Sequence, residues 1–197
     1  MTNPTGTKNE AWEFLAKLVG ARDLLFDRYP GDNDTKLKPH EKVYLNTANH
    51  CVVPVVNLYS CLTAENTKSV AKLCYGKKAG NIRIGINSFV TITGDDENSP
   101  NRMAALIRDG DGKPITRDDP RITVETHVAR LAKGVPNPKV RPCIHVPWSV
   151  TFHFRYLKNE FISREVLIDC LQQAGEIVGL GTFRPMFGKF VVEISEV

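Results

Sequence analysis

The sequence lacks any apolar run that could span a bilayer. The uncharged stretch from Ala48 to Ala64 contains Asn49, His50 and Pro54, which make it too polar for a transmembrane helix. The first seven residues also lack the basic start and apolar run of a secretory signal. We therefore expect no membrane partner and a cytoplasmic location.

The sequence also lacks a disulfide or metal-binding pattern. Its cysteines number five, an odd count, with no C-x-x-C pair among them. Most lie inside apolar runs, which favours buried free thiols. His40, His50 and His127 show no ligand spacing with the cysteines. The sequence therefore predicts no metal site and no cofactor.

Acidic residues are missing from one long part of the chain. Between Thr126 and Asn159 there is no Asp or Glu, whereas the whole chain of 197 residues has a net charge of only +4. The cations of this stretch are Arg130, Lys133, Lys139, Arg141, Arg155 and Lys158, with His127, His145 and His153 among them. Together with Lys77, Lys78 and Arg83, they are candidate contacts for a phosphate backbone. The alternative is a solvated basic surface.

The first half of the chain alternates between strand and helix patterns. A strand is predicted over residues 11–19 and a short one over 43–45. Pro54 and the apolar spacing after it predict a helix over residues 54–64. A second helix is expected from an Asn66 cap to Gly76. Isoleucines at alternate positions predict a strand over residues 82–92.

The second half contains the clearest periodicities. Residues 95–120 are rich in Asp, Gly and Pro, which predicts a solvated insertion, either a hairpin or a mobile loop. Residues 144–156 alternate strictly, which predicts one long strand whose Trp148, Phe152 and Phe154 lie in the core. The other expected elements are a strand over 122–128, a linker over 134–142, a helix from Ser163 to Gly179 and a strand over 190–194.

These elements predict an α+β chain of the ferredoxin-like type. Strand, helix and strand at the C-terminus form half of such a unit, and residues 11–92 supply the other half. The crossover rules then favour an antiparallel sheet with helices on one face and the other face open. We expect one domain over residues 1–197, with an insertion at about 95–120.

The sharpest local motif is the glycine-rich segment from Gly179 to Phe190. Gly179, Gly181 and Gly188 let the backbone approach another group closely, and Arg184 and Lys189 add positive charge. Because the segment follows a helix and precedes a strand, it is not a dinucleotide fingerprint. The alternatives are a plain connecting loop that begins at a helix-ending glycine, and an Arg184 that only holds loop carbonyl groups.

This segment carries a resemblance to a known group. Pro142, residues 148–152, Ala174-Gly175 and residues 178–190 resemble a group of uncharacterised phage and prophage proteins. Their glycine loop is similar to that of the RAMP superfamily, the ferredoxin-like RNA-binding proteins that form the backbones of CRISPR effectors. The phage and prophage group is similar over most of this chain, and the RAMP proteins are similar over its C-terminal half. The departure from a RAMP core is the 95–120 insertion, a candidate thumb-like hairpin that reaches a neighbouring subunit.

The resemblance implies a partner and a set of contacts. The partner is single-stranded RNA or DNA lying over the open sheet face, with RNA favoured over DNA, in a bacterial host cell. Gly179, Gly181, Arg184, Gly188 and Lys189 are then expected near the phosphates. The chain is expected to bind without catalysis and to assemble as a homo-oligomer or within a CRISPR-like protein complex.

Two other functions stay open. His145 and His153 are eight residues apart, roughly 27 Å along an extended strand, so they cannot act on one phosphate together. They are interpreted as nucleic-acid contacts, and a ribonuclease that uses either histidine is the least favoured alternative. The other alternative is a phage protein that binds and modulates a host protein complex such as a defence effector, with its docking patch in residues 95–120.

Overall fold

The computed structural model describes residues 11–130, 134 and 136–197, without the side chains of residues 129 and 130. A four-stranded antiparallel sheet lies at its centre, in the order β4-β8-β1-β9. Its strands are β1 (Ala11–Gly20), β4 (Val90–Gly94), β8 (Ser149–Leu157) and β9 (Phe190–Glu196). The second, third, first and fourth of these strands along the chain are thus neighbours in space. This is the ferredoxin-like order expected from the sequence.

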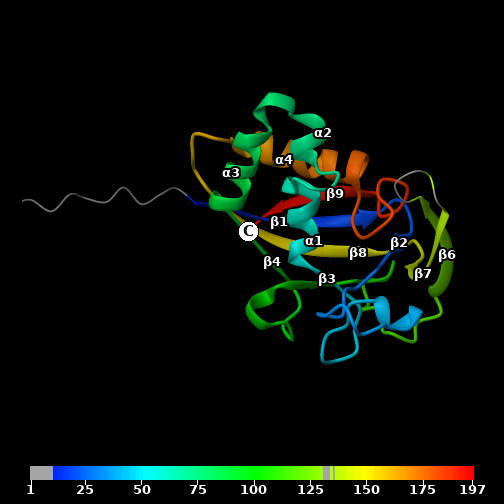
Figure 1. The fold of residues 1–197 in the computed structure, drawn as a ribbon. Coiled ribbons are helices and arrows are strands. Elements are labelled where there is room, and N and C mark those ends of the chain that lie inside the picture. The colour runs from blue at the N-terminus through cyan, green and yellow to red at the C-terminus, as the bar shows by residue number, and fades with distance from the viewer. Residues whose placement is uncertain (1–10, 131–133, 135) are drawn as a thin grey trace, which may run out of the picture.

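The helices pack on one face of this sheet (Figure 1). They are α1 (Val55–Thr63), α2 (Val70–Cys74), α3 (Ala79–Phe89) and α4 (Arg164–Gln173), which continues into the π-helical turn η5 (Ala174–Val178). Phe14, Phe152 and Phe154 lie fully buried in the core, as the alternation predicts, and the rings of Phe14 and Phe154 stack 4.8 Å apart. No helix in the described residues is long and apolar enough to cross a membrane.

Two smaller sheets flank the central one. Strands β2 (Leu24–Leu25), β7 (Pro136–Ile144) and β6 (Ile122–Arg130) form the first, in the order β2-β7-β6. Strands β3 (Val52–Pro54) and β5 (Ala104–Leu106) form the second. Short 3-10 turns occur at η1 (Pro39–Lys42), η2 (Gly76–Lys78) and η3 (Pro100–Arg102). The β6–β7 hairpin lies at one end of the molecule, beyond the ends of β1 and β8 (Figure 1).

The strand predicted over residues 82–92 is wrong. Helix α3 occupies most of this segment, and only its end forms β4. Ile82 and Ile86, one helical turn apart, are buried, whereas Ile84 between them is 45% exposed. A Cβ at Gly85 would lie 2.7 Å from Ile162, so this glycine lets the helix approach closely. The isoleucines recur every two residues, but only those one helical turn apart are buried, so the alternation did not indicate a strand.

Two predicted boundaries in the first half are also wrong. The second helix begins after Ser69, whose hydroxyl accepts a hydrogen bond from the Lys72 amide, and not after Asn66. Residues 43–45 form no regular strand, since only Leu45 pairs there, in an isolated bridge with Cys51.

The predicted linker over residues 134–142 is wrong, because strand β7 occupies most of it. The strand predicted over residues 144–156 begins later than predicted. Residues 136–144 pair along their whole length with β6, so this segment is half of a hairpin. Its prolines Pro136, Pro138 and Pro142 occupy alternate positions, and the Pro142 carbonyl accepts from Phe26 on the β2 side. The missing amides therefore lie on the side of β7 that faces away from β6. Proline is tolerated on that side, because β2 pairs there only with Cys143 and Ile144. The alternation over 144–156 is interrupted before Ser149, where β8 begins.

The segment over residues 95–120 is only partly solvated, because several of its residues are buried against the rest of the protein. Ala105, Ile107 and Ile115 are fully buried in it. Asp96 is also fully buried and accepts a hydrogen bond from the Asn46 side chain at 3.0 Å. The insertion packs on its own chain, because its scattered apolar residues fill the space beside β3.

Candidate nucleic-acid interface

The glycine-rich loop, residues 179–189, joins η5 to β9. The Leu180 amide donates to the Gly188 carbonyl at 2.9 Å, and the Gly188 amide donates to the Asp23 carbonyl at 2.7 Å. The Thr182 amide donates to the Leu25 carbonyl at 2.9 Å. The loop is thus closed on itself and held to the connection between β1 and β2.

The glycines of this loop are required by the protein's own backbone. Gly188 has a φ of +71°, and a Cβ there would lie 2.0 Å from the Leu180 carbonyl oxygen. Gly181 has a φ of +70°, with the Leu25 carbonyl 2.3 Å from its ideal Cβ position. Gly179 is similarly close to Phe187. Close internal packing therefore explains all three glycines, without an approach to phosphate.

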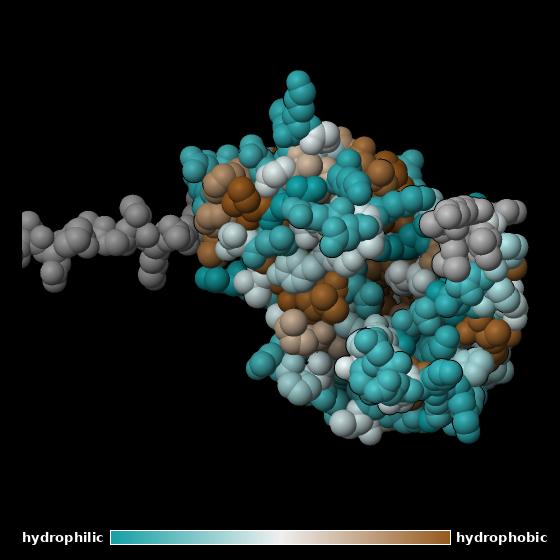
Figure 2. Space-filling view, viewed as in Figure 1, coloured by the Kyte–Doolittle hydropathy of each residue, from teal (hydrophilic) through white to brown (hydrophobic). Residues whose placement is uncertain are grey.

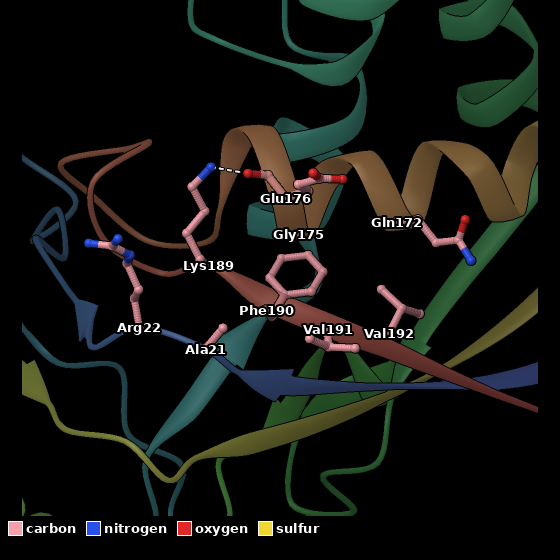
Figure 3. Close-up of a pocket in the computed structure, with 9 residues that line it drawn as sticks. All are labelled: Ala21, Arg22, Gln172, Gly175, Glu176, Lys189, Phe190, Val191 and Val192. Atoms are coloured by element: carbon pink, nitrogen blue, oxygen red, sulfur yellow. Dashed lines mark hydrogen bonds between the residues drawn. The ribbon is translucent and has the colours of Figure 1, made fainter.

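Three cations lie beside this loop. Arg184 donates to the Thr67 hydroxyl at 3.3 Å, and the Lys189 ammonium donates to the Glu176 carbonyl. Arg22, which follows β1, lies on the same side as Lys189 (Figure 3). We call Arg22, Arg184 and Lys189 the loop cation cluster. Arg22 was not predicted, although its position just after the first strand puts it at the edge of the sheet where the glycine loop returns.

The electrostatics of the cluster favour an anion. Partial burial and the nearby Arg22 guanidinium lower the pKa of Lys189, against the opposing effect of Glu176. Beneath the cluster, burial raises the pKa of the Cys61 thiol to about 12, although Arg184 and Lys189 act in the opposite direction. The thiol is therefore neutral and does not balance the positive charge. A phosphate group would do so.

A pocket of about 590 Å³ opens beside the loop cation cluster. It lies between the α4–η5 helix and the edge strand β9, and Figure 3 shows the Phe190 ring and Val192 along its wall. Its lining residues are Ala21, Arg22, Gln172, Gly175, Glu176, Lys189, Phe190, Val191 and Val192. The pocket combines an apolar wall with two cations and is large enough for a nucleobase.

Arg141 belongs to the protein interior, which corrects its assignment as a phosphate contact. Its side chain is 9% exposed and pairs with Asp27 at 2.6 Å. Its guanidinium also lies 4.7 Å from the centroid of the Phe183 ring. Burial raises the pKa of Asp27, but hydrogen bonds and charge from Arg141 and Lys42 outweigh it, and the pKa is lowered. Arg141 therefore joins β7 to the segment after β2 through Asp27, and to the glycine loop through Phe183.

Other predicted cations of the hairpin are placed differently. Lys139 lies on β7 opposite His127 and is partly exposed. His127 packs against the rings of Phe183 and Phe187. The Arg130 side chain lies outside the described part of the chain, as does Lys133.

The open face of the sheet is uncovered by helices but is neutralised by its own acids. Arg155 and His153 both lie 3.3 Å from Glu13. Lys17 pairs with Glu193 at 3.4 Å. This face therefore offers a polar surface with little net charge at its centre.

Lys77, Lys78 and Arg83 lie in the helical layer. The two lysines form η2, and Arg83, on α3, pairs with Glu65 at 3.4 Å. Figure 1 shows α3 and the β6–β7 hairpin at opposite ends of the molecule. The structure does not bring these cations together with those of the hairpin.

His145 lies in the turn after β7, so it does not share a strand face with His153. Its Nδ1 lies 2.9 Å from an Asp23 carboxylate oxygen, and its Nε2 lies 2.9 Å from the Thr123 hydroxyl. Both ring nitrogens are thus engaged within the protein.

Comparison with known proteins supports the fold. No family model matches the sequence, and no curated protein matches it. Among the 76 solved chains that do match is a chain from the cryo-EM structure of the type III-B Cmr-beta complex bound to cognate target RNA. The TM-score is 0.57 at 12% sequence identity, over 95% of this chain and 61% of that one, so this chain spans about three fifths of its length. The likeness is one of fold, and with the strand order it confirms the α+β, ferredoxin-like architecture.

Proposed function

We propose that this protein is a non-catalytic RAMP-type subunit that binds single-stranded RNA, in a complex of like or related subunits. The observation that carries this proposal is the loop cation cluster, in which Arg22 and Lys189 line a nucleobase-sized pocket and Arg184 extends from the same glycine-rich loop as Lys189. The structural neighbour supports the choice of RNA, because that complex is bound to target RNA. A phage or prophage origin remains the implication of the sequence resemblance.

The proposed RNA path follows the end of the sheet at the glycine loop, where the three cations of the loop cation cluster outnumber the nearby Glu176 carboxylate. The backbone phosphates contact Arg22, Arg184 and Lys189, and one base enters the pocket beside Phe190. The centre of the open face, where Glu13 pairs with Arg155 and lies 3.3 Å from His153, receives less of the strand. Contacts of this kind bind without reading sequence, since phosphates carry no base identity.

The direct test is fluorescence anisotropy with labelled single-stranded RNA, single-stranded DNA and double-stranded RNA over a salt series. We expect single-stranded RNA to bind most tightly, with an affinity that falls as salt rises, because phosphate contacts release counterions. We also expect the RNA to remain intact on a denaturing gel. Binding that is absent or independent of salt would end the proposal, and cleavage lost in His145→Gln would replace it with a ribonuclease.

A second candidate function, protein interaction, is favoured by the β6–β7 hairpin. Its outward face carries Val124, Val128 and Val140, which are 49%, 57% and 37% exposed. Its inward face carries polar groups such as Glu125 and His127. Figure 2 shows hydrophobic residues at the edge of the molecule where β6 runs. We call Val124, Val128 and Val140 the valine face, and exposed apolar surface on a strand pair suits a contact with a protein.

Substitution of Val124 and Val128 by lysine tests whether the valine face joins neighbouring subunits. We expect the wild-type protein to load cooperatively on a long RNA strand, and the double variant to bind the same RNA without cooperativity. Sedimentation velocity measures the number of copies bound. Thr91→Lys, at an exposed position on β4, is the matched control and should retain cooperativity. Equal loading by all three proteins would exclude this role, and capture of a host protein by the wild type alone would favour the protein-interaction function.

A further inference from the structure

A group of potential metal ligands lies where three segments meet. Asp23 follows β1, Cys143 lies on β7, and His145 lies in the turn after β7. One ligand atom from each of these side chains lies within 4.8 Å of the other two. Residues 120 positions apart in sequence are thus brought together by the β2–β7 pairing.

Glu125, on the neighbouring strand β6, lies beside this group and is not part of it. Its carboxylate is 3.6 Å from His145 Nε2, whereas the Asp23 carboxylate is 2.9 Å from Nδ1, on the other side of the same ring. The group therefore offers one sulfur, one imidazole nitrogen and one carboxylate. Tetrahedral zinc keeps such atoms about 3.3 to 3.8 Å apart, so small side-chain rotations suffice, and a water would be the fourth ligand.

The electrostatics and the access of the group also suit a cation. Cys143 is fully buried, and the Asp23 carboxylate lies beside it. A divalent cation would attract this carboxylate and bind the cysteine as its thiolate. His145 and Asp23 are each about a third exposed, which gives an ion a route from solvent.

We propose that Asp23, Cys143 and His145 form a zinc-binding site. The mixture of thiolate, imidazole and carboxylate is the ligand set that zinc accepts, whereas magnesium and calcium prefer oxygen alone. The sequence predicted no metal site, because His145 was interpreted as a nucleic-acid contact and Asp23 is distant from it in sequence.

The ion would act as a clamp. Asp23 also accepts the Gly188 amide through its carbonyl, at 2.7 Å, so it is tied to the glycine loop. A metal bound by Asp23, Cys143 and His145 would fix the end of β7 against this loop. The clamp would stabilise the junction whether or not the loop binds RNA, so it does not depend on the proposed function.

The test begins with protein that has been reduced and stripped of metal with a chelator. Cobalt titration should produce the near-ultraviolet charge-transfer band of a cobalt–thiolate bond, and zinc should abolish that band by displacement. Zinc should also raise the thermal unfolding temperature of the wild-type protein. Cys143→Ser should abolish the band, and His145→Gln should weaken zinc binding by more than about a hundredfold, since even residues that only support a ligand cost 10- to 100-fold.

Cys74→Ser is the matched control, because Cys74 is partly exposed on α2 and lies outside the group. It should keep both the band and the zinc-induced stabilisation. His145→Gln guards against misfolding of the Cys143 variant, since His145 is partly exposed. The proposal is overturned if the wild type shows no cobalt–thiolate band, or if the band survives in Cys143→Ser.

Discussion

Replacing Arg22, Arg184 and Lys189 together with glutamine is expected to weaken binding of single-stranded RNA about a hundredfold at moderate salt. Each charged contact with a phosphate contributes roughly 1 kcal/mol or more at a partly exposed site, so three contacts reach this size. The slope of log affinity against log salt should also become shallower by about 2, because single strands contribute about 0.7 per contact. Fluorescence anisotropy over a salt series measures both quantities.

The matched control is Lys77→Gln with Lys78→Gln. These lysines were equally strong candidates from the sequence, but they lie in the helical layer, on η2. We expect this variant to bind with nearly the wild-type affinity and salt slope. If the lysine pair carries the larger loss, the RNA crosses the helical layer and the proposed path is wrong. Circular dichroism should confirm that both variants are folded.

The parts of the fold that could be predicted are those in which the spacing of the apolar residues along the sequence matches the face that is buried in the structure. Helix α4 was predicted because its apolar stripe is continuous and Ser163 caps its first turn. Strand β8 was predicted because one of its faces is buried against helices. Helix α3 was missed because isoleucines also occur at exposed positions such as Ile84, so local period indicated a strand. Strand β7 was missed because its prolines favour a linker, and the sequence does not show that their missing amides lie on the side away from β6, where β2 pairs only with Cys143 and Ile144.

The candidate site was predicted less well, because a sequence shows charges but not their partners. Arg141 and Arg155 look equally available in an acid-free stretch, yet one is buried against Asp27 and the other pairs with Glu13. Both partners come from distant segments of the chain. Arg22 has neutral and acidic neighbours, so composition did not distinguish it. Only the tertiary fold brings it beside Lys189.

Gly188→Ala is expected to lower the free energy of unfolding by about 2 to 5 kcal/mol. Its φ of +71° costs about 1 to 2 kcal/mol for a residue with a side chain. In addition, the new Cβ would lie 2.0 Å from the Leu180 carbonyl oxygen, so the loop backbone must move. Overpacking of this kind adds roughly 1 to 3 kcal/mol or more. Urea denaturation followed by tryptophan fluorescence measures the loss.

Gly112→Ala is the control that separates the cost of a positive φ from the cost of a steric clash. Gly112 has a comparable φ of +80° in an exposed turn, with nothing within 4 Å of its ideal Cβ position. It should therefore lose only about 1 to 2 kcal/mol. If Gly188→Ala were no worse than Gly112→Ala, the loop would be looser than its hydrogen bonds indicate. If Gly188→Ala instead kept its stability and lost RNA binding, the glycine would serve phosphate approach, and the cations would no longer be the main source of affinity.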